Sequence, residues 1–295
     1  MDKKAKAAAK DEWKAITREG NLTLRKNLTI DIKWENETLD HQLIGYLNYK
    51  GRAMEMSDIV EFNNRLLTVD DKTGLVYDIT KRKGKAIPWL FLNSGPGNTT
   101  SGMKVEWLTE KDGLLYAGGH GSEYRNTSTG QVTSMDPMWI KTITKTGEVK
   151  SLNWFWPFSK LRNASGYPEP GYLTHEAVQW SSVHRKWFFL PRKASKTAYN
   201  ETEDETKGCQ LLITADENFA NIVVKKIDGE PHPKRGYSAF DFIPNSRDTV
   251  MVALKSEEVG NRTESYVSVL AINGRVFLED QNLEGDHKFE GIYFI

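Results

Sequence analysis

Cysteine is almost absent from this chain of 295 residues, which carries Cys209 alone. A single cysteine excludes an intrachain disulfide, so no covalent cross-link of this kind holds the fold together. Long hydrophobic runs are also missing, since no stretch approaches the ~18 apolar residues that a membrane-spanning helix needs. The fold therefore depends on a hydrophobic core, for which nine Trp, eleven Tyr and twelve Phe are available.

An excess of either charge is lacking too, because 40 basic side chains balance 40 acidic ones. A protein that binds nucleic acid through its phosphates normally shows a basic excess, so this class is not expected. No Gly-rich loop follows an apolar run and opens a helical pattern, which argues against a P-loop or a Rossmann phosphate site.

Eight Asn-X-Ser/Thr acceptor sites are present, more than an ordinary composition gives by chance. Glycosylation is useful only to a chain that enters the secretory pathway. We therefore predict a secreted protein, with the ER or Golgi lumen as the alternative, although the single cysteine alone would be more typical of the cytosol. The acceptors are Asn21, Asn27, Asn36, Asn98, Asn126, Asn163, Asn200 and Asn261.

Residues 1–41 are predicted to form an N-terminal extension to one domain that spans 42–295. Residues 1–19 are highly charged and contain no apolar h-region, so they do not read as a signal peptide. They predict either a short solvated helix that ends at Gly20 or a disordered tail. For a secreted chain, this pattern predicts that a targeting segment or membrane anchor has been removed.

From residue 42 onward, short apolar runs alternate with turn residues. Strand–turn–strand units that recur every ~8–12 residues favour a sandwich, barrel or propeller over a βαβ fold. Residues 153–165 are the best candidate for a helical insertion, although Pro157 weakens that prediction. The clearest turns are Asn63-Asn64, Lys111-Asp112-Gly113, Lys145-Thr146-Gly147, His184-Arg185-Lys186 and Asn273-Gly274.

Five apolar segments each carry one oxygen-bearing residue near their start, with gaps of 49, 70, 62 and 52 positions. Each gap suits one four-stranded sheet with its connections. Five such sheets around an axis would form a five-bladed β-propeller whose inner strands surround a hard cation with oxygens. Ordinary solvated strand ends would give the same spacing, so the pattern leaves both interpretations open. The five residues are Ser57, Glu106, Glu176, Ser238 and Glu290.

Longer stretches around these residues resemble the calcium-activated nucleotidases, the apyrase family, from about residue 43 to the C-terminus. The matching stretches are SDIVEFNNRLLTVDDKTGLVYDI from 57, KVEWLTEKDGLLYAGGHGSE from 104, GYLTHEAVQWSSVHRKWFFLPRK from 171, GYSAFDFIPN from 236, VALKSEE from 252 and KFEGIYFI from 288. The resemblance implies an all-β, five-bladed propeller with a central Ca²⁺. It also implies that the ligands are Ser57, Asp58, Glu106, Glu176, Ser238 and Glu290.

The resemblance further implies Ca²⁺-dependent hydrolysis of the terminal phosphates of ADP, UDP, GDP or ATP. Phosphoryl transfer asks mainly for positioning and for neutralisation of charge. Basic side chains must therefore assist the cation, and Arg192 is the preferred phosphate clamp. The other candidates are Lys72, Lys104, Lys193 and Lys255, of which Lys72 and Lys193 replace the Arg that relatives often carry.

Asp70 and Asp71 match an acidic pair of the family and are the candidates for activating water, although Asp is also a frequent turn former. Glu123 matches an acidic family position, while Tyr124 stands where relatives carry Trp and could stack on the base. The expected partner is a nucleotide, without nucleic acid or membrane, and a homodimer is possible. The alternatives are a lumenal nucleoside diphosphatase that supports glycosylation and a non-catalytic binding propeller with structural Ca²⁺.

Overall fold

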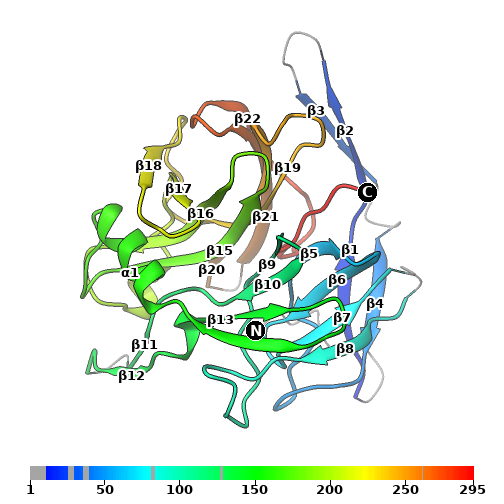
Figure 1. Ribbon diagram of the computed structural model, residues 1–295. Helices are drawn as coiled ribbons and strands as arrows, with labels where there is room; N and C mark the ends of the chain where they lie inside the picture. The colour runs from blue at the N-terminus through cyan, green and yellow to red at the C-terminus, as the bar shows by residue number, and fades with distance from the viewer. Residues whose placement is uncertain (1–10, 26–29, 36–39, 81–83, 127–128, 261) are drawn as a thin grey trace.

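The chain folds as an all-β protein in which four antiparallel sheets are arranged around a common axis (Figure 1). This computed structural model describes residues 11–25, 30–35, 40–80, 84–126, 129–260 and 262–295. Each of the four sheets has four strands, and its first strand in the sequence lies at one edge of the sheet. This is a β-propeller arrangement, so the prediction of an all-β propeller is confirmed.

Each sheet takes its four strands from one stretch of the chain. The first sheet contains β5 (Met56–Phe62), β6 (Arg65–Asp70), β7 (Leu75–Asp78) and β8 (Ile87–Phe91). The second contains β9 (Trp107–Lys111), β10 (Leu114–Gly118), β13 (Trp139–Ile143) and β14 (Val149–Asn153). The third contains β15 (Tyr172–Ser181), β16 (Lys186–Ser195), β17 (Leu211–Asp216) and β18 (Ile222–Lys226). The fourth contains β19 (Arg235–Phe242), β20 (Val250–Val259), β21 (Arg262–Ala271) and β22 (Val276–Asn282).

Smaller elements complete the described fold. Three two-stranded sheets pair β1 (Trp13–Thr17) with β4 (His41–Gly45), β2 (Gly20–Leu24) with β3 (Ile30–Trp34), and β11 (Tyr124–Arg125) with β12 (Val132–Ser134). The helices are α1 (Phe155–Ala164), α2 (Glu201–Asp204) and a single 3₁₀ turn at Asp136–Met138. Among the described residues, no helix is long and apolar enough to cross a bilayer.

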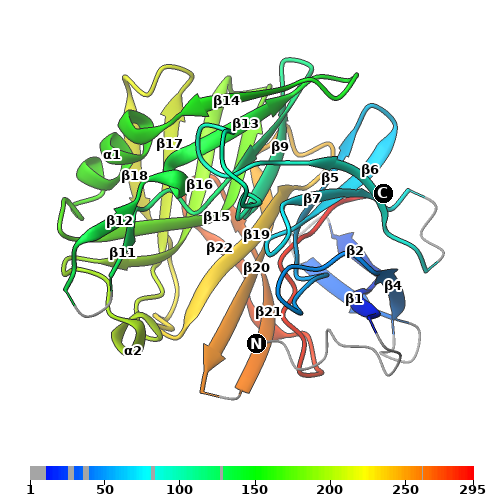
Figure 2. The ribbon, with the colours of Figure 1, turned by 90° about the horizontal axis from the view of Figure 1, so that it is seen from below.

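The predicted number of five blades is wrong, because the described residues form only four four-stranded sheets. The remaining sector is filled by the two N-terminal strand pairs and by the extended segment 288–295 (Figures 1 and 2). The spacing overcounted because it assigned one inner strand to each oxygen residue. Glu290 lies instead in the C-terminal segment, which is assigned to no strand. Phe289, Ile292 and Phe294 of that segment pack on the fourth sheet.

The prediction of a helix or a disordered tail over residues 1–19 is wrong for Trp13–Thr17, which form a strand paired with β4. Residues 1–10 lie outside the described residues. Trp13 is buried against the first sheet, and Arg18 donates to both carboxylate oxygens of Asp40 at 2.8 Å. β1 lies before the predicted boundary at 41/42 and β4 lies across it, yet the two strands form one small sheet.

The predicted turns are confirmed, since each of the five connects two adjacent antiparallel strands. The helical insertion is confirmed as α1, between the second and third sheets. Its buried Phe158 joins an aromatic core with Trp154 and Trp187, whose rings lie 5.1 Å apart and almost perpendicular. The helix is therefore retained because its inner face completes the core between two sheets.

Side-chain hydrogen bonds join the first three inner strands at one level of the channel. Asp58 Oδ2 of β5 accepts the Leu108 N–H of β9 at 2.7 Å. Thr109 Oγ1 accepts the Trp180 N–H of β15 at 3.0 Å and donates to Gln179 Oε1 at 2.8 Å. These bonds satisfy buried polar groups across sheet boundaries, where no backbone ladder exists.

The circuit closes through the fourth sheet and the C-terminal segment. Gln179 Nε2 donates to the Phe240 carbonyl of β19 at 3.2 Å. Ser238 Oγ of β19 donates to the Phe289 carbonyl at 2.9 Å, and the Asp58 N–H donates to the Glu290 carbonyl at 2.8 Å. We call Asp58, Thr109, Gln179, Ser238 and their hydrogen-bond partners the girdle. The girdle fixes the relative positions of the inner strands.

The substitution Gln179→Ala should lower the free energy of unfolding by about 1–3 kcal/mol, because it leaves Thr109 and the Phe240 carbonyl without their partner. Urea unfolding followed by tryptophan fluorescence measures the change. The matched control is Gln131→Ala, which removes an exposed glutamine. Equal stability of the two variants would show that the girdle contributes nothing.

Candidate functional site

Three of the predicted site residues sit at β-bulges in inner strands. Asp58, Glu176 and Ser238 are the extra residues where β5, β15 and β19 shift register against the next strand. Asp58 has a φ of 58°, a left-handed conformation that Asp tolerates better than most residues. A bulge re-aims the side chain of the extra residue and bends its strand. Each of these three sheets therefore presents one bulged residue to the same channel.

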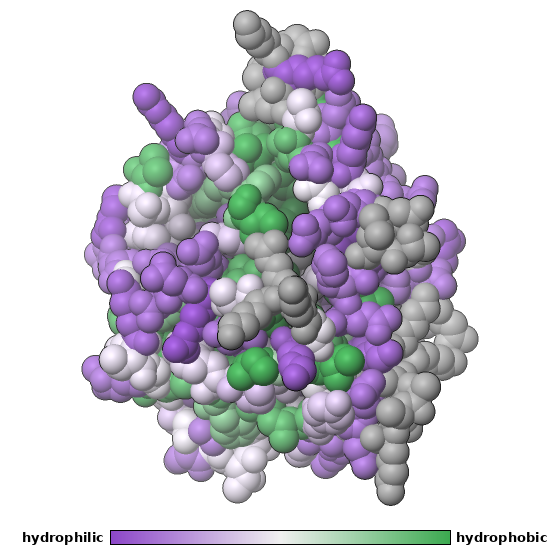
Figure 3. All heavy atoms as spheres, turned by 90° about the vertical axis from the view of Figure 1, so that its right-hand side faces the viewer, coloured by the Kyte–Doolittle hydropathy of each residue, from purple (hydrophilic) through white to green (hydrophobic). Residues whose placement is uncertain are grey.

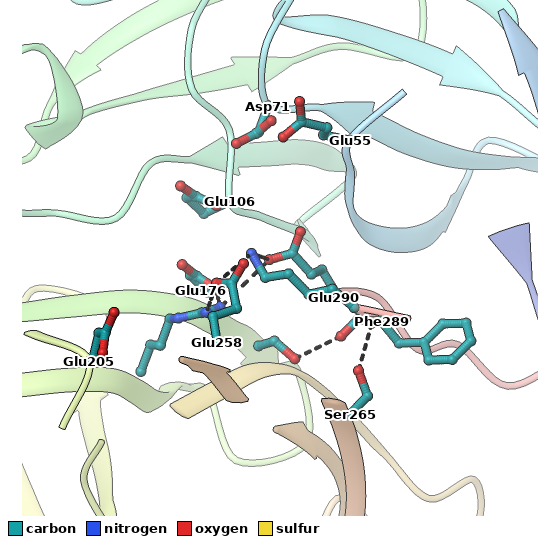
Figure 4. A network of polar contacts seen from close by, with 12 residues as sticks. Glu55, Asp71, Glu106, Glu176, Glu205, Glu258, Ser265, Phe289 and Glu290 are labelled. Atoms are coloured by element: carbon teal, nitrogen blue, oxygen red, sulfur yellow. Dashed lines mark hydrogen bonds and ion pairs between the residues drawn. The ribbon is translucent and has the colours of Figure 1, made fainter. Parts of the chain in front are cut away.

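Carboxylates from separate segments gather at the mouth of this channel, among them Asp71, Glu106, Glu176, Glu258 and Glu290 (Figure 4). They come from the turn after β6, the residue before β9, the bulge of β15, the end of β20 and the C-terminal segment. We call Glu106, Glu176 and Glu290 the ring glutamates. Glu106 is 2% exposed, and the other two are largely buried.

Each ring glutamate is paired with a cationic side chain. Lys104 Nζ contacts Glu106 Oε1, and Arg192 Nη1 contacts Glu176 Oε2. Lys288 Nζ lies 2.6 Å from Glu290 Oε1. Buried carboxylates that converge in this way repel one another, so paired cations are required for all of them to stay charged.

All three of these basic side chains also contact further carboxylates, and Lys288 Nζ lies 3.2 Å from Glu258 Oε2. Arg192 Nη2 donates to Glu258 Oε2 at 2.7 Å, and its Nη1 lies 3.6 Å from Glu290 Oε1. Lys104 Nζ lies 3.3 Å from Asp71 Oδ2. Arg192 itself occupies an irregular position in β16 that faces the Glu176 bulge. The guanidinium therefore links three carboxylates from three different segments.

The C-terminal segment is held so that Glu290 reaches the ring. The Phe289 N–H donates to Ser265 Oγ at 2.8 Å, and the Phe289 carbonyl accepts from Ser238 Oγ at 2.9 Å (Figure 4). Ser57 Oγ is buried with no hydrogen-bond partner, which marks it as an oxygen available to a further group. Asp58 is buried, and its two carboxylate oxygens accept the Ile59 and Leu108 N–H groups.

The donor set suits a hard cation. The three ring glutamates and the unpartnered Ser57 Oγ offer oxygen atoms alone, which Ca²⁺ prefers and Zn²⁺ does not. Among the described residues, no three His, Cys, Asp or Glu side chains are arranged so that they could hold a metal ion as they stand. Each ring glutamate is paired with a basic side chain. His175, next to Glu176, stacks on Phe158 at 5.6 Å and belongs to the core.

The two neighbouring aspartates have different environments. Asp70 is fully buried, and its carboxylate accepts from Thr73 Oγ1 at 2.8 Å and from the Met54 and Lys72 N–H groups at 3.1 Å. Burial raises the pKa of Asp70 to about 6. The side chain therefore holds the turn and the start of β5, away from the ring.

Asp71 points toward the ring carboxylates (Figure 4). Its Oδ2 lies 2.8 Å from Lys72 Nζ, and its Oδ1 is buried without a partner. Burial opposes ionisation, but Lys104 and Lys72 hold the pKa of Asp71 below its ordinary value. Asp71 therefore stays charged and keeps one oxygen free to accept a proton or a hydrogen bond.

The other predicted binding residues are divided between this site and separate networks. Tyr124 is exposed, and its ring lies 5.4 Å from that of His120. Glu123 is bound by Arg162 at 2.9 Å and by Arg125 at 2.5 Å. Two lysines are committed elsewhere. Lys193 Nζ donates to the Asp204 carbonyl at 2.8 Å, and Lys255 Nζ lies 2.8 Å from Asp280.

Sequence reasoning missed four charged residues of the site. Lys288 and Glu258 bind to each other at 3.2 Å, and Arg52 donates to Glu55 at 2.6 and 2.8 Å beside Lys72. A signal for Lys288 was present, because KFE at 288–290 repeats the Lys-X-Glu spacing of KVE at 104–106. The other three come from positions that show no spacing relative to the five oxygen residues.

A cavity of about 860 Å³ extends from this charged centre to the N-terminal strands. Its polar end includes Asp71, Lys104 and Glu290. Its apolar end includes Trp34 and Leu254, and a hydrophobic hollow is visible on this face in Figure 3. Of the three ring glutamates, Glu290 lines this cavity, which is large enough to hold a molecule considerably larger than water.

The sequence model described as Apyrase matches residues 1–295. The chain is 41% identical over 285 residues to apyrase apy-1 of Caenorhabditis elegans, covering 96% of this chain and 79% of that protein. It is 41% identical over 296 residues to soluble calcium-activated nucleotidase 1 of Rattus norvegicus, covering 100% and 72%. It is 40% identical over 293 residues to an apyrase of Cimex lectularius, covering 98% and 79%.

If the ring glutamates hold Ca²⁺, its affinity should increase as the pH rises from about 6 to about 8. Burial and the neighbouring Glu176 and Glu290 raise the pKa of Glu106 above its ordinary value, despite the opposing charge of Lys104. Glu106 must therefore lose any bound proton before it ligates a cation, so binding releases protons at lower pH. Isothermal titration calorimetry in two buffers of different ionisation heat measures affinity and proton release. An affinity independent of pH in the wild type would contradict the assignment; Glu148→Gln, at an exposed glutamate, is the control.

Proposed function

Since the chain belongs to the apyrase family and is a nucleotide-hydrolysing enzyme, we propose that it removes the terminal phosphate of nucleoside di- and triphosphates with Ca²⁺ bound at the ring glutamates. One observation carries this proposal. Three buried glutamates and three basic side chains are joined by ion pairs around one channel, and three of these six side chains, Lys104, Lys288 and Glu290, line a large cavity. Carboxylates suit the cation, and the basic side chains suit the phosphates.

The fifth oxygen-bearing segment supports the proposed cation site even though it belongs to no four-stranded sheet. Glu106, Glu176 and Glu290 would hold Ca²⁺, with oxygens of Ser57, Ser238 and Asp58 completing the shell. When bound, the cation would neutralise phosphate charge. Asp58 also joins β5 to β9, and Ser238 joins β19 to the C-terminal segment, so the same residues would set the size of the site.

Arg192 is proposed as the phosphate clamp, with Lys104 and Lys72 beside it. Its guanidinium lies among three carboxylates and presents several fixed N–H donors. In the reaction, water adds to the terminal phosphorus, the bridging P–O bond breaks, and orthophosphate leaves the shortened nucleotide. The negative charge on the phosphoryl oxygens is what the cationic side chains stabilise.

Asp71 is proposed to orient the attacking water and accept its proton. It is charged, it lies beside Lys104, and one of its oxygens has no partner. Asp70 is proposed to position the turn, because its oxygens already accept three hydrogen bonds. Asp71 would then take part in the reaction, whereas Asp70 would stabilise the turn that carries Asp71.

The nucleobase is proposed to stack on Tyr124, which is exposed on β11 and braced by His120. Glu123 would then act indirectly, since Arg125 and Arg162 hold its carboxylate beside Tyr124. A tyrosine stacks on any base, so ADP, UDP, GDP and ATP all remain substrates under this proposal.

We also propose that the protein is glycosylated in the secretory pathway, either as a secreted enzyme or in the ER or Golgi lumen. Five of the acceptor asparagines lie in the described residues and all five are exposed: Asn21, Asn98, Asn126, Asn163 and Asn200. The other three, Asn27, Asn36 and Asn261, lie outside the described residues. Exposure of every described acceptor is what glycosylation requires.

The substitution Glu106→Ala should abolish Ca²⁺-dependent phosphate release, because it removes a buried ring glutamate and leaves Lys104 with Asp71 as its one remaining acidic partner among the described residues. Release of orthophosphate from ADP, UDP and ATP is measured with Ca²⁺, with Mg²⁺ and with a chelator. Absence of hydrolysis by the wild type with Ca²⁺ would contradict the proposed Ca²⁺-dependent hydrolysis of nucleotides. Equal activity with Mg²⁺ would count against the Ca²⁺ site, and a fully active Glu106→Ala would remove that residue from it.

The acidic pair gives a matched comparison. Asp71→Asn should lower kcat by about 10²-fold while leaving the fold intact, because it removes the proton acceptor. Asp70→Asn should lower the free energy of unfolding by about 1–3 kcal/mol and change kcat far less. Steady-state kinetics and urea unfolding of both variants measure the split. The reverse pattern would exchange the two roles.

A further inference from the structure

Two lysines of the site repeat one local arrangement. Lys104 precedes Glu106 by two residues, and Lys288 precedes Glu290 by two residues. In each pair the ammonium contacts its own glutamate, at 2.6 Å for Lys288. Each ammonium also reaches a second carboxylate, Asp71 at 3.3 Å from Lys104 and Glu258 at 3.2 Å from Lys288.

The backbone explains how the two pairs form. Both lie in extended segments, one just before β9 and one in the C-terminal segment. In extended chain, residues two apart point to the same side, so the lysine and the glutamate face the channel together. Lys104 and Lys288 also line the same cavity, together with Glu290. They are therefore two equivalent basic positions at the edge of one site.

In each pair, the lysine ammonium and the proposed Ca²⁺ bind to the same glutamate. Glu106 and Glu290 are bound by lysines in the structure, and the same two residues are the proposed ligands of Ca²⁺. A carboxylate that ligates a divalent cation interacts more weakly with a neighbouring ammonium, because the two positive charges repel. Binding of Ca²⁺ to Glu106 and Glu290 therefore weakens the contacts of these glutamates with their lysines, and the lysine contacts in turn weaken the binding of Ca²⁺.

We propose that Lys288 is a second phosphate-binding lysine, matched to Lys104, and that both lysines compete with Ca²⁺ for the ring glutamates. This inference rests on the proposed function. Once Glu106 and Glu290 ligate the cation, each lysine loses one of its two anionic partners, and a polyphosphate at the channel mouth replaces it. Binding of the cation and binding of the nucleotide then favour each other.

A purely structural ion pair would behave in the opposite way. If Lys288 merely held Glu290 in position, its removal would loosen that glutamate and weaken Ca²⁺ binding. Competition predicts tighter Ca²⁺ binding after its removal, because a positive charge that repels the cation and occupies its ligand is gone. The sign of the change in Ca²⁺ affinity therefore separates the two roles without measuring turnover.

The variant Lys288→Met should bind Ca²⁺ about five- to tenfold more tightly than the wild type in the absence of nucleotide. It should bind a methylene-bridged ADP analogue about tenfold more weakly in the presence of Ca²⁺. Calorimetric titrations with CaCl₂ and with the analogue measure both values. Lys104→Met should show the same two changes, and Lys150→Met, at an exposed lysine of β14, should show neither.

Thermal unfolding guards against a variant that fails to fold. In chelator, Lys288→Met should melt below the wild type, because Glu290 and Glu258 lose their shared partner, and Ca²⁺ should restore most of the loss. Should Lys288→Met fail to fold even with Ca²⁺, Lys288→Gln is titrated instead. Unchanged or weaker Ca²⁺ binding by a folded variant overturns the inference, as does unchanged affinity for the analogue.

The controls separate this inference from the proposed function. If the wild type releases phosphate from ADP with Ca²⁺ but Lys288→Met behaves like Lys150→Met, the inference alone fails. If the wild type releases no phosphate, the proposed function fails, and the CaCl₂ titrations still decide whether lysine and cation compete.

Discussion

The convergence of buried carboxylates on one axis is the constraint on which the rest of this structure depends. Glu106, Glu176 and Glu290 are close enough that Glu106 is affected by the charge of the other two. Burying such a group of like charges costs several kcal/mol per ion unless each is paired. The fold meets this demand with Lys104, Arg192 and Lys288, each supplied by the same strand or segment as its glutamate or by the adjacent strand.

The same constraint accounts for the girdle beneath the ring. Mutual repulsion among the glutamates would push the inner strands apart, and sheets in a propeller share no backbone ladder with their neighbours. Asp58, Thr109, Gln179 and Ser238 provide hydrogen bonds across those boundaries instead. Asp58 also helps to position Glu290, because the Asp58 N–H donates a hydrogen bond to the Glu290 carbonyl. Asp58 therefore contributes both to the spacing of the sheets and to the placement of the third ring glutamate.

Local chemistry made much of the fold predictable, whereas long-range pairing did not. Turns such as Asn63-Asn64 and Asn273-Gly274 are specified by two adjacent residues, and the structure confirms them. The strand at Trp13–Thr17 exists because it pairs with His41–Gly45, and its charged composition carries no trace of that partner. The bulges that aim Glu176 and Ser238 are likewise set by register between strands. Spacing located these residues but could not show that four sheets, with one extended segment, line the channel.

Charge arithmetic at the channel mouth gives a physical reason for coupling cation and nucleotide. Five basic side chains, Arg52, Lys72, Lys104, Arg192 and Lys288, face six carboxylates, for a formal balance of about minus one. The carboxylates are Glu55, Asp71, Glu106, Glu176, Glu258 and Glu290. A centre of that sign attracts a divalent cation and repels a polyphosphate. Addition of one divalent cation reverses the balance to about plus one, and the same centre then attracts the polyphosphate. Because the reversal needs no movement of the sheets, a rigid propeller is sufficient for a cation-dependent site.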